Sequence, residues 1–130
     1  MRLLLILPLL LVLGCKESLL EQQIRVAMNV LTSEHDAREG ILVACPSRDT
    51  SPQCEVLYTS QNNLADAHTA YVRALDEAAN ADQWSRPQMQ EAQRVLCQAL
   101  RTYMTYAEDL GVMVHLPRRV TQTCFPGDEE

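Results

Sequence analysis

Cysteine is the residue type with the widest chemistry in this chain, which has five of them, at positions 15, 45, 54, 97 and 124. A cysteine thiolate can bind a metal, attack a substrate or form a disulfide. No two of these cysteines have the spacing of two to four residues that is typical of zinc ribbons and fingers. The spacing therefore disfavours a metal site and points to disulfides or modification.

The other polar groups do not combine into a catalytic motif. His35 and Glu39 are four residues apart, a spacing that could present two metal ligands on one helix face, but no third ligand accompanies them. His68 fits either a hydrogen-bonded core histidine or a pH-sensitive interface or general base. Ser51 and Ser60 belong to no nucleophile motif, and the four glycines form no phosphate-binding loop. We therefore expect no catalytic residue, no cofactor and no bound metal.

The amino terminus has the organisation of a secretion signal. Met1-Arg2 supplies positive charge, and the apolar run over residues 3–13 is shorter than the roughly 20 residues that span a bilayer. Val12-Leu13-Gly14-Cys15 resembles the lipobox of bacterial lipoproteins, which implies that residues 1–14 are removed and that Cys15 carries lipid. The resemblance is limited to residues 1–15. The alternative is an ordinary secreted protein or an uncleaved anchor.

The same resemblance implies a location in the cell envelope, anchored to a membrane through Cys15 and facing the periplasm. In enteric lipoproteins an aspartate directly after the lipidated cysteine retains the protein in the inner membrane. Lys16 stands at that position, so the outer membrane is favoured. Without Arg2, ten basic residues remain against 17 acidic ones, a net charge of about −7. Nucleic acid is therefore not an expected partner, and the lipid, not a basic helix, should hold the protein on the membrane.

If Cys15 is lipidated, the remaining cysteines form an even set in an oxidising compartment, which favours two disulfides. Four cysteines allow three pairings, and the sequence does not choose among them. Cys45 and Cys54 bracket a short turn-forming segment, so a bridge between them is the easiest to form. The chain is also long enough for Cys97 to reach Cys124.

Apolar spacing predicts three long helices. The first starts soon after the anchor and ends between Gly40 and Pro46. The second covers roughly 25 residues, and the third starts at Ser85-Arg86-Pro87-Gln88 and ends at Gly111. Each helix has one stripe that is expected to face a core. In the first these residues are Leu20, Ile24, Ala27, Met28 and Leu31, in the second Leu57, Leu64, Tyr71, Leu75 and Ala78, and in the third Met89, Ala92, Leu96, Ala99, Tyr103, Tyr106 and Leu110.

These elements predict an all-α fold: a small helical bundle of about three helices, built on an antiparallel helical hairpin and holding two disulfides. Residues 15–130 should form a single domain anchored through Cys15. From about residue 112 we expect a non-helical tail that is clamped across the third helix, with disorder beyond Phe125.

Three aromatic residues are candidates for binding a partner. Tyr103 and Tyr106 share the stripe of the third helix, where core packing is the alternative. Trp84 lies in the connection before that helix, where it could anchor a partner or simply cover the end of the hairpin.

The sequence therefore predicts a non-catalytic, membrane-anchored envelope lipoprotein whose helical domain binds another protein, in an accessory, exclusion or immunity-like role. A structural lipoprotein that associates with itself is the alternative, and an apolar stripe left exposed after folding would favour it. A periplasmic enzyme is a remote alternative, which a deep pocket holding His68 beside a carboxylate would support.

Overall fold

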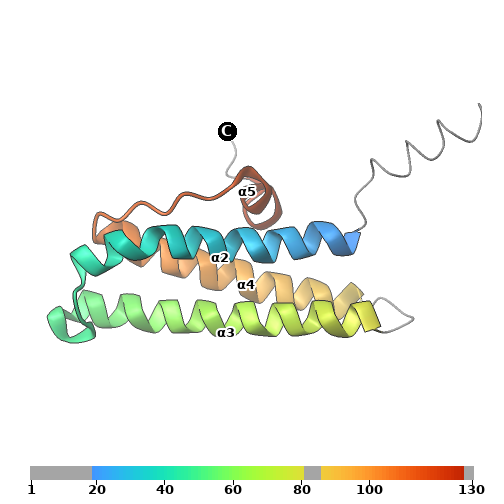
Figure 1. Cartoon of the computed structure of the whole chain (residues 1–130), viewed down its shortest axis with the longest axis horizontal. Helices are drawn as coiled ribbons and strands as arrows, with labels where there is room; N and C mark the ends of the chain where they lie inside the picture. The colour runs from blue at the N-terminus through green and yellow to red at the C-terminus, as the bar shows by residue number, and fades with distance from the viewer. Residues whose placement is uncertain (1–18, 81–85, 128–130) are drawn as a thin grey trace, which may run out of the picture.

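A computed structural model describes residues 19–80 and 86–127, and within them the chain is helical and contains no strand. The long helices are α2 (Leu19–Ala44), α3 (Pro52–Asn80) and α4 (Arg86–Asp109). A 3-10 turn, η1 (Arg48–Thr50), precedes α3, and a short helix, α5 (Arg118–Cys124), follows α4. Figure 1 shows the three long helices side by side, and α5 packs against α2 and α4. The prediction of an all-α fold is confirmed.

The ends of α3 and α4 follow local sequence signals. The Ser51 hydroxyl accepts a hydrogen bond from the backbone N–H of Cys54 at 3.1 Å, and Pro52 occupies the first helical position, where its missing N–H costs nothing. Helix α4 is closed by a turn at Gly111, whose φ of +78° suits a residue without a Cβ. Two backbone bonds close this end, from Gly111 N–H to the Glu108 carbonyl and from Val112 N–H to that of Ala107, both 2.9 Å long.

Helices α3 and α4 are the most closely packed pair in the described structure. The buried α3 positions at the predicted stripe are Leu57, Leu64, Tyr71 and Leu75, and those of α4 include Met89, Leu96 and Tyr103. Small side chains between them, such as Ser60 and Ala67 on α3, let the two backbones approach. The predicted core faces of the second and third helices are therefore confirmed at these residues.

Helix α2 runs antiparallel to α3, and three hydrogen bonds fix the register. The Tyr71 hydroxyl donates to Gln23 Oε1, His68 Nε2 bonds the Ala27 carbonyl at 2.9 Å, and Gln61 Nε2 donates to Glu34 Oε1 at 3.1 Å. From one bond to the next, the residue number rises along α2 and falls along α3. This register brings the amino-terminal half of α2 beside the carboxy-terminal half of α3.

The predicted core stripe of α2 is wrong for its large residues. Ile24, Met28 and Leu31 are exposed, and of this stripe only Ala27 is buried and Leu20 partly buried. Helix α2 instead turns a second apolar face toward the shared core, formed by Val26, Val30, Ala37 and Ile41. Apolar spacing pointed to the wrong face, because the neighbouring helices decide which apolar face of α2 is covered.

Both disulfides are present with the pairing that the loop lengths favoured. Cys45–Cys54 joins the end of α2 to the start of α3, and Cys97–Cys124 joins α4 to the end of α5, with Cα–Cα distances of 5.5 and 5.1 Å. The tail is thus held against α4, as expected. The prediction that the tail is non-helical from about residue 112 is wrong, because residues 118–124 form α5. This helix buries Val120, and Phe125 directly after it is buried as well.

Candidate functional site

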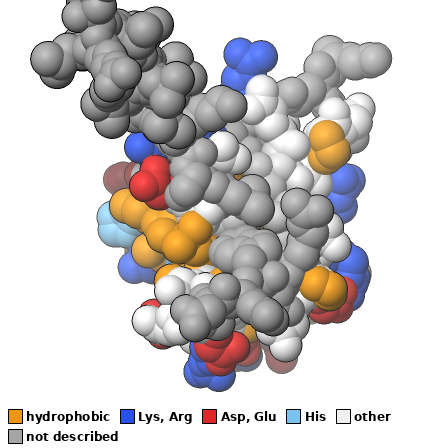
Figure 2. Space-filling model, turned by 90° about the vertical axis from the view of Figure 1, so that its right-hand side faces the viewer, with side chains coloured by type: hydrophobic (Ala, Val, Ile, Leu, Met, Phe, Trp, Pro, Cys, Tyr) orange, Lys and Arg blue, Asp and Glu red, His pale blue; other side chains and the backbone are white. Residues whose placement is uncertain are grey.

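The strongest candidate site is an apolar hollow of about 320 Å³ between α2 and α3, which we call the α2–α3 groove. Its floor and walls are made of side chains from both helices: Ile24, Ala27, Met28, Leu31, His68, Val72, Leu75, Asp76 and Ala79. Figure 2 looks at the end of the molecule where α2 begins and α3 ends, and it shows a patch of hydrophobic side chains at the left, beside a histidine.

Four large apolar side chains in the groove are open to solvent. The exposed fractions are 41% for Ile24, 62% for Met28, 52% for Leu31 and 43% for Val72. Single exposed apolar residues are common on protein surfaces, whereas a cluster that lines one hollow is typical of an interaction site. The groove can therefore bind an apolar surface of matching shape.

His68 forms part of the groove wall and also ties it together. Since the Ala27 carbonyl can only accept, His68 Nε2 carries the proton of their 2.9 Å hydrogen bond. The side chain is partly buried, and Leu75 lies two turns further along the same helix. His68 is thus the hydrogen-bonded histidine that the sequence allowed, and its Nε2 faces a backbone carbonyl.

The ends of the groove are polar. On α3, Asp76 lies at the rim and accepts a hydrogen bond from Asn80 Nδ2 at 3.3 Å. One heptad beyond Ala27 on α2, Glu34 accepts the bond from Gln61, and Arg38 Nη2 lies 3.6 Å from the Glu34 carboxylate. The apolar part of the groove is therefore limited to the half of α2 that is nearer its amino terminus.

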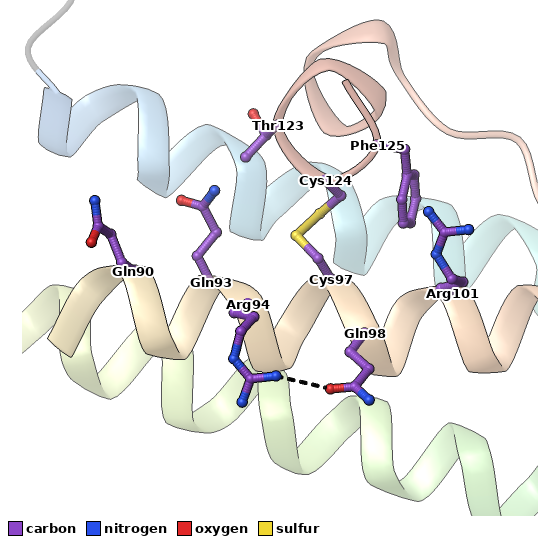
Figure 3. A pocket seen from close by; sticks show the side chains of 9 residues that line it. All are labelled: Gln90, Gln93, Arg94, Cys97, Gln98, Arg101, Thr123, Cys124 and Phe125. Atoms are coloured by element: carbon purple, nitrogen blue, oxygen red, sulfur yellow. Dashed lines mark hydrogen bonds between the residues drawn. A yellow bond between two sulfur atoms is a disulfide. The ribbon is translucent and has the colours of Figure 1, made fainter. Parts of the chain in front are cut away.

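A second hollow, of about 350 Å³, lies between α4 and α5 around the Cys97–Cys124 disulfide (Figure 3). Gln90 and Gln93 point toward α5, whereas Arg94 and Gln98 point away from it and are joined by a 3.2 Å hydrogen bond. Its remaining wall includes the Arg101 guanidinium, which stacks over the Phe125 ring at 4.7 Å. The amides and guanidinium groups could hold a polar ligand, but the hollow contains no pairing of a nucleophile with a base.

Arg94 is also held by Glu91, whose Oε1 lies 2.7 Å from Arg94 Nη2. This hydrogen bond and the arginine charge lower the pKa of the Glu91 carboxyl, and the carboxylate raises the pKa of Arg94. Both side chains are exposed, so the pair is an ordinary surface interaction of one helical turn.

The predicted partner-binding residues are not brought together. Trp84, like the lipidation candidate Cys15, lies outside the residues that the structure describes. Tyr103 has no exposed surface, so its side chain belongs to the core, as the alternative interpretation held. Tyr106 is partly buried and packs against that core.

The Tyr103 hydroxyl is buried, and nothing in the described part of the chain hydrogen-bonds it. Burial raises the pKa of Tyr103, and the nearby Glu34 charge raises it further, against a smaller opposing effect of Arg38. Burial likewise raises the pKa of Tyr71, whose hydroxyl donates to Gln23. Both phenols therefore stay neutral at the pH where an exposed tyrosine ionises.

The remaining polar candidates either form hydrogen bonds within the fold or lie exposed on its surface. Ser51 caps α3, and the buried Ser60 hydroxyl donates to the Leu57 carbonyl at 2.6 Å. His35 and Glu39 are exposed on α2. Across the described ranges 19–80 and 86–127, no three histidine, cysteine or acidic side chains form a cluster that could hold a metal ion.

The groove residues that the sequence missed are the exposed ones of α2. A usable signal was present, because α2 carries more apolar residues than one face can hold: Val26, Val30 and Ile41 occupy one side, and Ile24, Met28 and Leu31 another. A helix with two apolar faces predicts either complete burial or a second contact.

Within the described residues, no helix is both long enough and apolar enough to cross a membrane. No protein-family model matches this chain, and neither the curated proteins nor the solved structures contain a match to it.

Proposed function

We propose that this protein is a non-catalytic envelope lipoprotein, anchored to the membrane through lipid on Cys15, whose helical domain binds a protein helix in the α2–α3 groove. The observation that carries the proposal is the cluster of exposed apolar side chains that lines the groove. An apolar hollow between two antiparallel helices matches the surface of a third helix, which presents side chains at intervals of three and four residues.

The position of the groove fits an anchored protein. Leu19, at the start of α2, lies four residue steps after Cys15, so this connection extends to about 14 Å at most. Ile24 lies five residues into the helix, which adds about 8 Å. The groove therefore begins within about 22 Å of the lipidated residue, and its binding partner is expected at or near the membrane surface.

The exposed stripe also supports the alternative function, a lipoprotein that associates with itself. Both functions use the same groove and differ only in the protein that fills it. The enzyme alternative has less support, because His68 Nε2 is engaged by a backbone carbonyl. We further propose that the closely packed α3 and α4 form the antiparallel hairpin on which the bundle is built, and that Lys16 favours delivery to the outer membrane.

Two measurements test this function. The intact mass of the protein from its own membranes, with Cys15→Ser as control, should show an acylated chain that begins at Cys15. Reduction should add about four protons, since two disulfides are present. A chain that retains Met1 would contradict the anchor.

The binding site is tested with a photo-crosslinking amino acid at Met28, in the groove, and at Met113, which lies outside it. The two methionines have similar exposed fractions, 62% and 67%. A discrete protein adduct at Met28, absent at Met113 and weakened when Cys15 is replaced, is expected. Equal labelling at both sites would contradict the groove as the binding surface.

A further inference from the structure

The exposed face of α2 repeats with the spacing of a coiled-coil seam. Steps of four and three residues lead from Ile24 to Met28 and Leu31, and the same steps continue along the helix to His35, Arg38 and Leu42. All six residues are exposed, while the bundle core uses the other side of α2. Alternating steps of three and four residues are the pattern by which one helix packs along another.

The groove and this stripe complement each other. The groove needs a helix that carries apolar residues at such steps, and α2 is itself a helix of this kind. We propose that the α2–α3 groove binds α2 of a second copy of this chain, so that each α2 lies over the groove of the other. This inference rests on the proposed function, because it names the partner of the same groove and uses the same anchor.

A two-fold axis makes the arrangement self-complementary. In a two-fold dimer the same patch serves both copies, so the ridge of Ile24, Met28 and Leu31 on one copy packs between α2 and α3 of its partner. Val72 and Leu75, on the far wall of the groove, would then contact the partner's ridge. Side chains that are half exposed in the single chain become covered in the pair.

The anchor decides the direction of the pairing. Helix α2 has 26 residues and is about 39 Å long. An antiparallel pair that met at Met28 would place the two α2 starts, each nine residues before Met28, about 27 Å apart. A parallel pair puts both anchors at the same end, next to one membrane, and equivalent residues then face each other across the axis.

Polar residues limit the contact to the membrane-proximal half. In a parallel pair Arg38 would approach Arg38 of the second copy, and like charges repel. Each Arg38 is instead oriented by Glu34 of its own chain, 3.6 Å away. Two straight helices that cross at about 20° are closest at the crossing point and diverge away from it, which suits an apolar contact centred on Met28, from Ile24 to Leu31. Confinement to a membrane raises the effective concentration, so a small interface is sufficient.

The first test uses the full-length protein in its own membranes, with two differently tagged copies in the same cells. Met28→Cys is compared with Met113→Cys under mild oxidation. The expected result is a disulfide-linked species that carries both tags for Met28→Cys and not for Met113→Cys. Such a bond requires the two Cα atoms to come within about 7 Å of each other, which a specific contact at Met28 provides. Random collision would link the two exposed positions equally, and equal linking of both variants would overturn the proposal.

The second test reads the direction. Parallel pairing should link Ile24→Cys to Ile24→Cys and Leu31→Cys to Leu31→Cys, whereas antiparallel pairing should link Ile24→Cys to Leu31→Cys in mixed cells. Met28→Arg should also reduce the Leu31→Cys dimer by at least about tenfold, because an unpaired charge would be buried in the contact. Met113→Arg, the matched control, should leave it unchanged.

These outcomes separate the inference from the function on which it rests. A photo-adduct at Met28 that contains one copy of this chain and a different protein would overturn the second-copy proposal and leave a protein-binding groove. Absence of any protein adduct at Met28, with intact disulfides and a native circular dichroism spectrum, would overturn both.

Discussion

The imidazole of His68 on α3 donates a hydrogen bond from Nε2 to the backbone carbonyl of Ala27 on α2, at 2.9 Å. This bond joins the two walls of the α2–α3 groove at the point where Ala27 is buried and Met28 is exposed. A carbonyl inside a helix has a second lone pair, so it can accept this bond in addition to the one from its own helix. His68 thus fixes the spacing of the helices that form the groove.

Replacement of His68 by leucine should lower the free energy of unfolding by about 1 kcal/mol, since one partly buried hydrogen bond is lost and its acceptor keeps its helical partner. Urea unfolding followed by circular dichroism measures the change. His115→Leu is the control, because His115 is exposed between α4 and α5 and lies outside the groove, and it should stay within about 0.5 kcal/mol of the original protein. An equal loss in both variants would show that the His68 bond contributes nothing specific.

The two buried tyrosines predict opposite effects of the same substitution. Tyr71→Phe removes the donor that Gln23 accepts from and should cost about 1 kcal/mol. Tyr103→Phe removes a buried hydroxyl that no described group hydrogen-bonds, so the unfolding free energy should stay equal or rise by up to about 1 kcal/mol. Urea midpoints of both variants test this. Loss of stability in Tyr103→Phe would reveal a partner for its hydroxyl.

Stability should fall at alkaline pH. Burial raises the pKa of Tyr71 and Tyr103 in the folded state above the value of about 10 for an unfolded chain. The folded protein therefore holds these two protons more tightly than the unfolded chain. Their contribution to the free energy of unfolding is fully present below about pH 10, and it is lost as the pH rises toward the pKa values of the folded state. Urea midpoints at pH 8 and pH 11 measure the decline. It should be smaller in Tyr103→Phe, and an identical decline would contradict the assignment.

The two disulfides should differ in exposure and in effect. Both cysteines of the Cys45–Cys54 disulfide are almost fully buried, whereas the Cys97–Cys124 disulfide lines an open hollow. Limited reductant should therefore open Cys97–Cys124 first, as mass spectrometry of alkylated peptides would show. Its loop has a sequence separation of 27, against 9 for the other. Chain entropy predicts losses of about 3.5 and about 2.6 kcal/mol when each pair is replaced by alanines.

Gly111 ends α4 with a φ of +78°, a conformation that a side chain disfavours. Gly111→Ala should therefore destabilise the protein by about 1 to 2 kcal/mol, although an added Cβ would meet no atom within 4 Å. Gly127→Ala is the control, since its Cβ also meets nothing and its φ is not positive. Thermal unfolding compares the two. Equal melting temperatures would show that the backbone relaxes at Gly111.

Most helix boundaries and the closed loops could be predicted because their causes are local. Gly111 accommodates a positive φ without reference to any distant residue. The start of α3 at Pro52 was not predicted, because residues 46–53 were interpreted as a turn, although Ser51 and Pro52 are residues favoured at a helix start. The pairing of Cys45 with Cys54 follows from the short turn between them, and the pairing of Cys97 with Cys124 is what remains.

The short helix α5 could not be predicted in this way. Seven residues are too few to hold a helix by propensity alone. Burial of Val120 and the bond from Cys124 to Cys97 stabilise it, and both depend on where α4 lies. A pattern within residues 112–127 therefore carries little information about its structure.

The sequence by itself determined that this chain is helical, where its long helices end and that α2 is apolar on more than one side. Only the tertiary structure decided which side is covered. The free energy of burying Val30 or Leu31 depends on the surface that each meets, and Val30 is buried in the core whereas Leu31 is 52% exposed. The groove is the result: apolar residues that the sequence assigns to a core line an exposed hollow because no further helix of the described structure covers them.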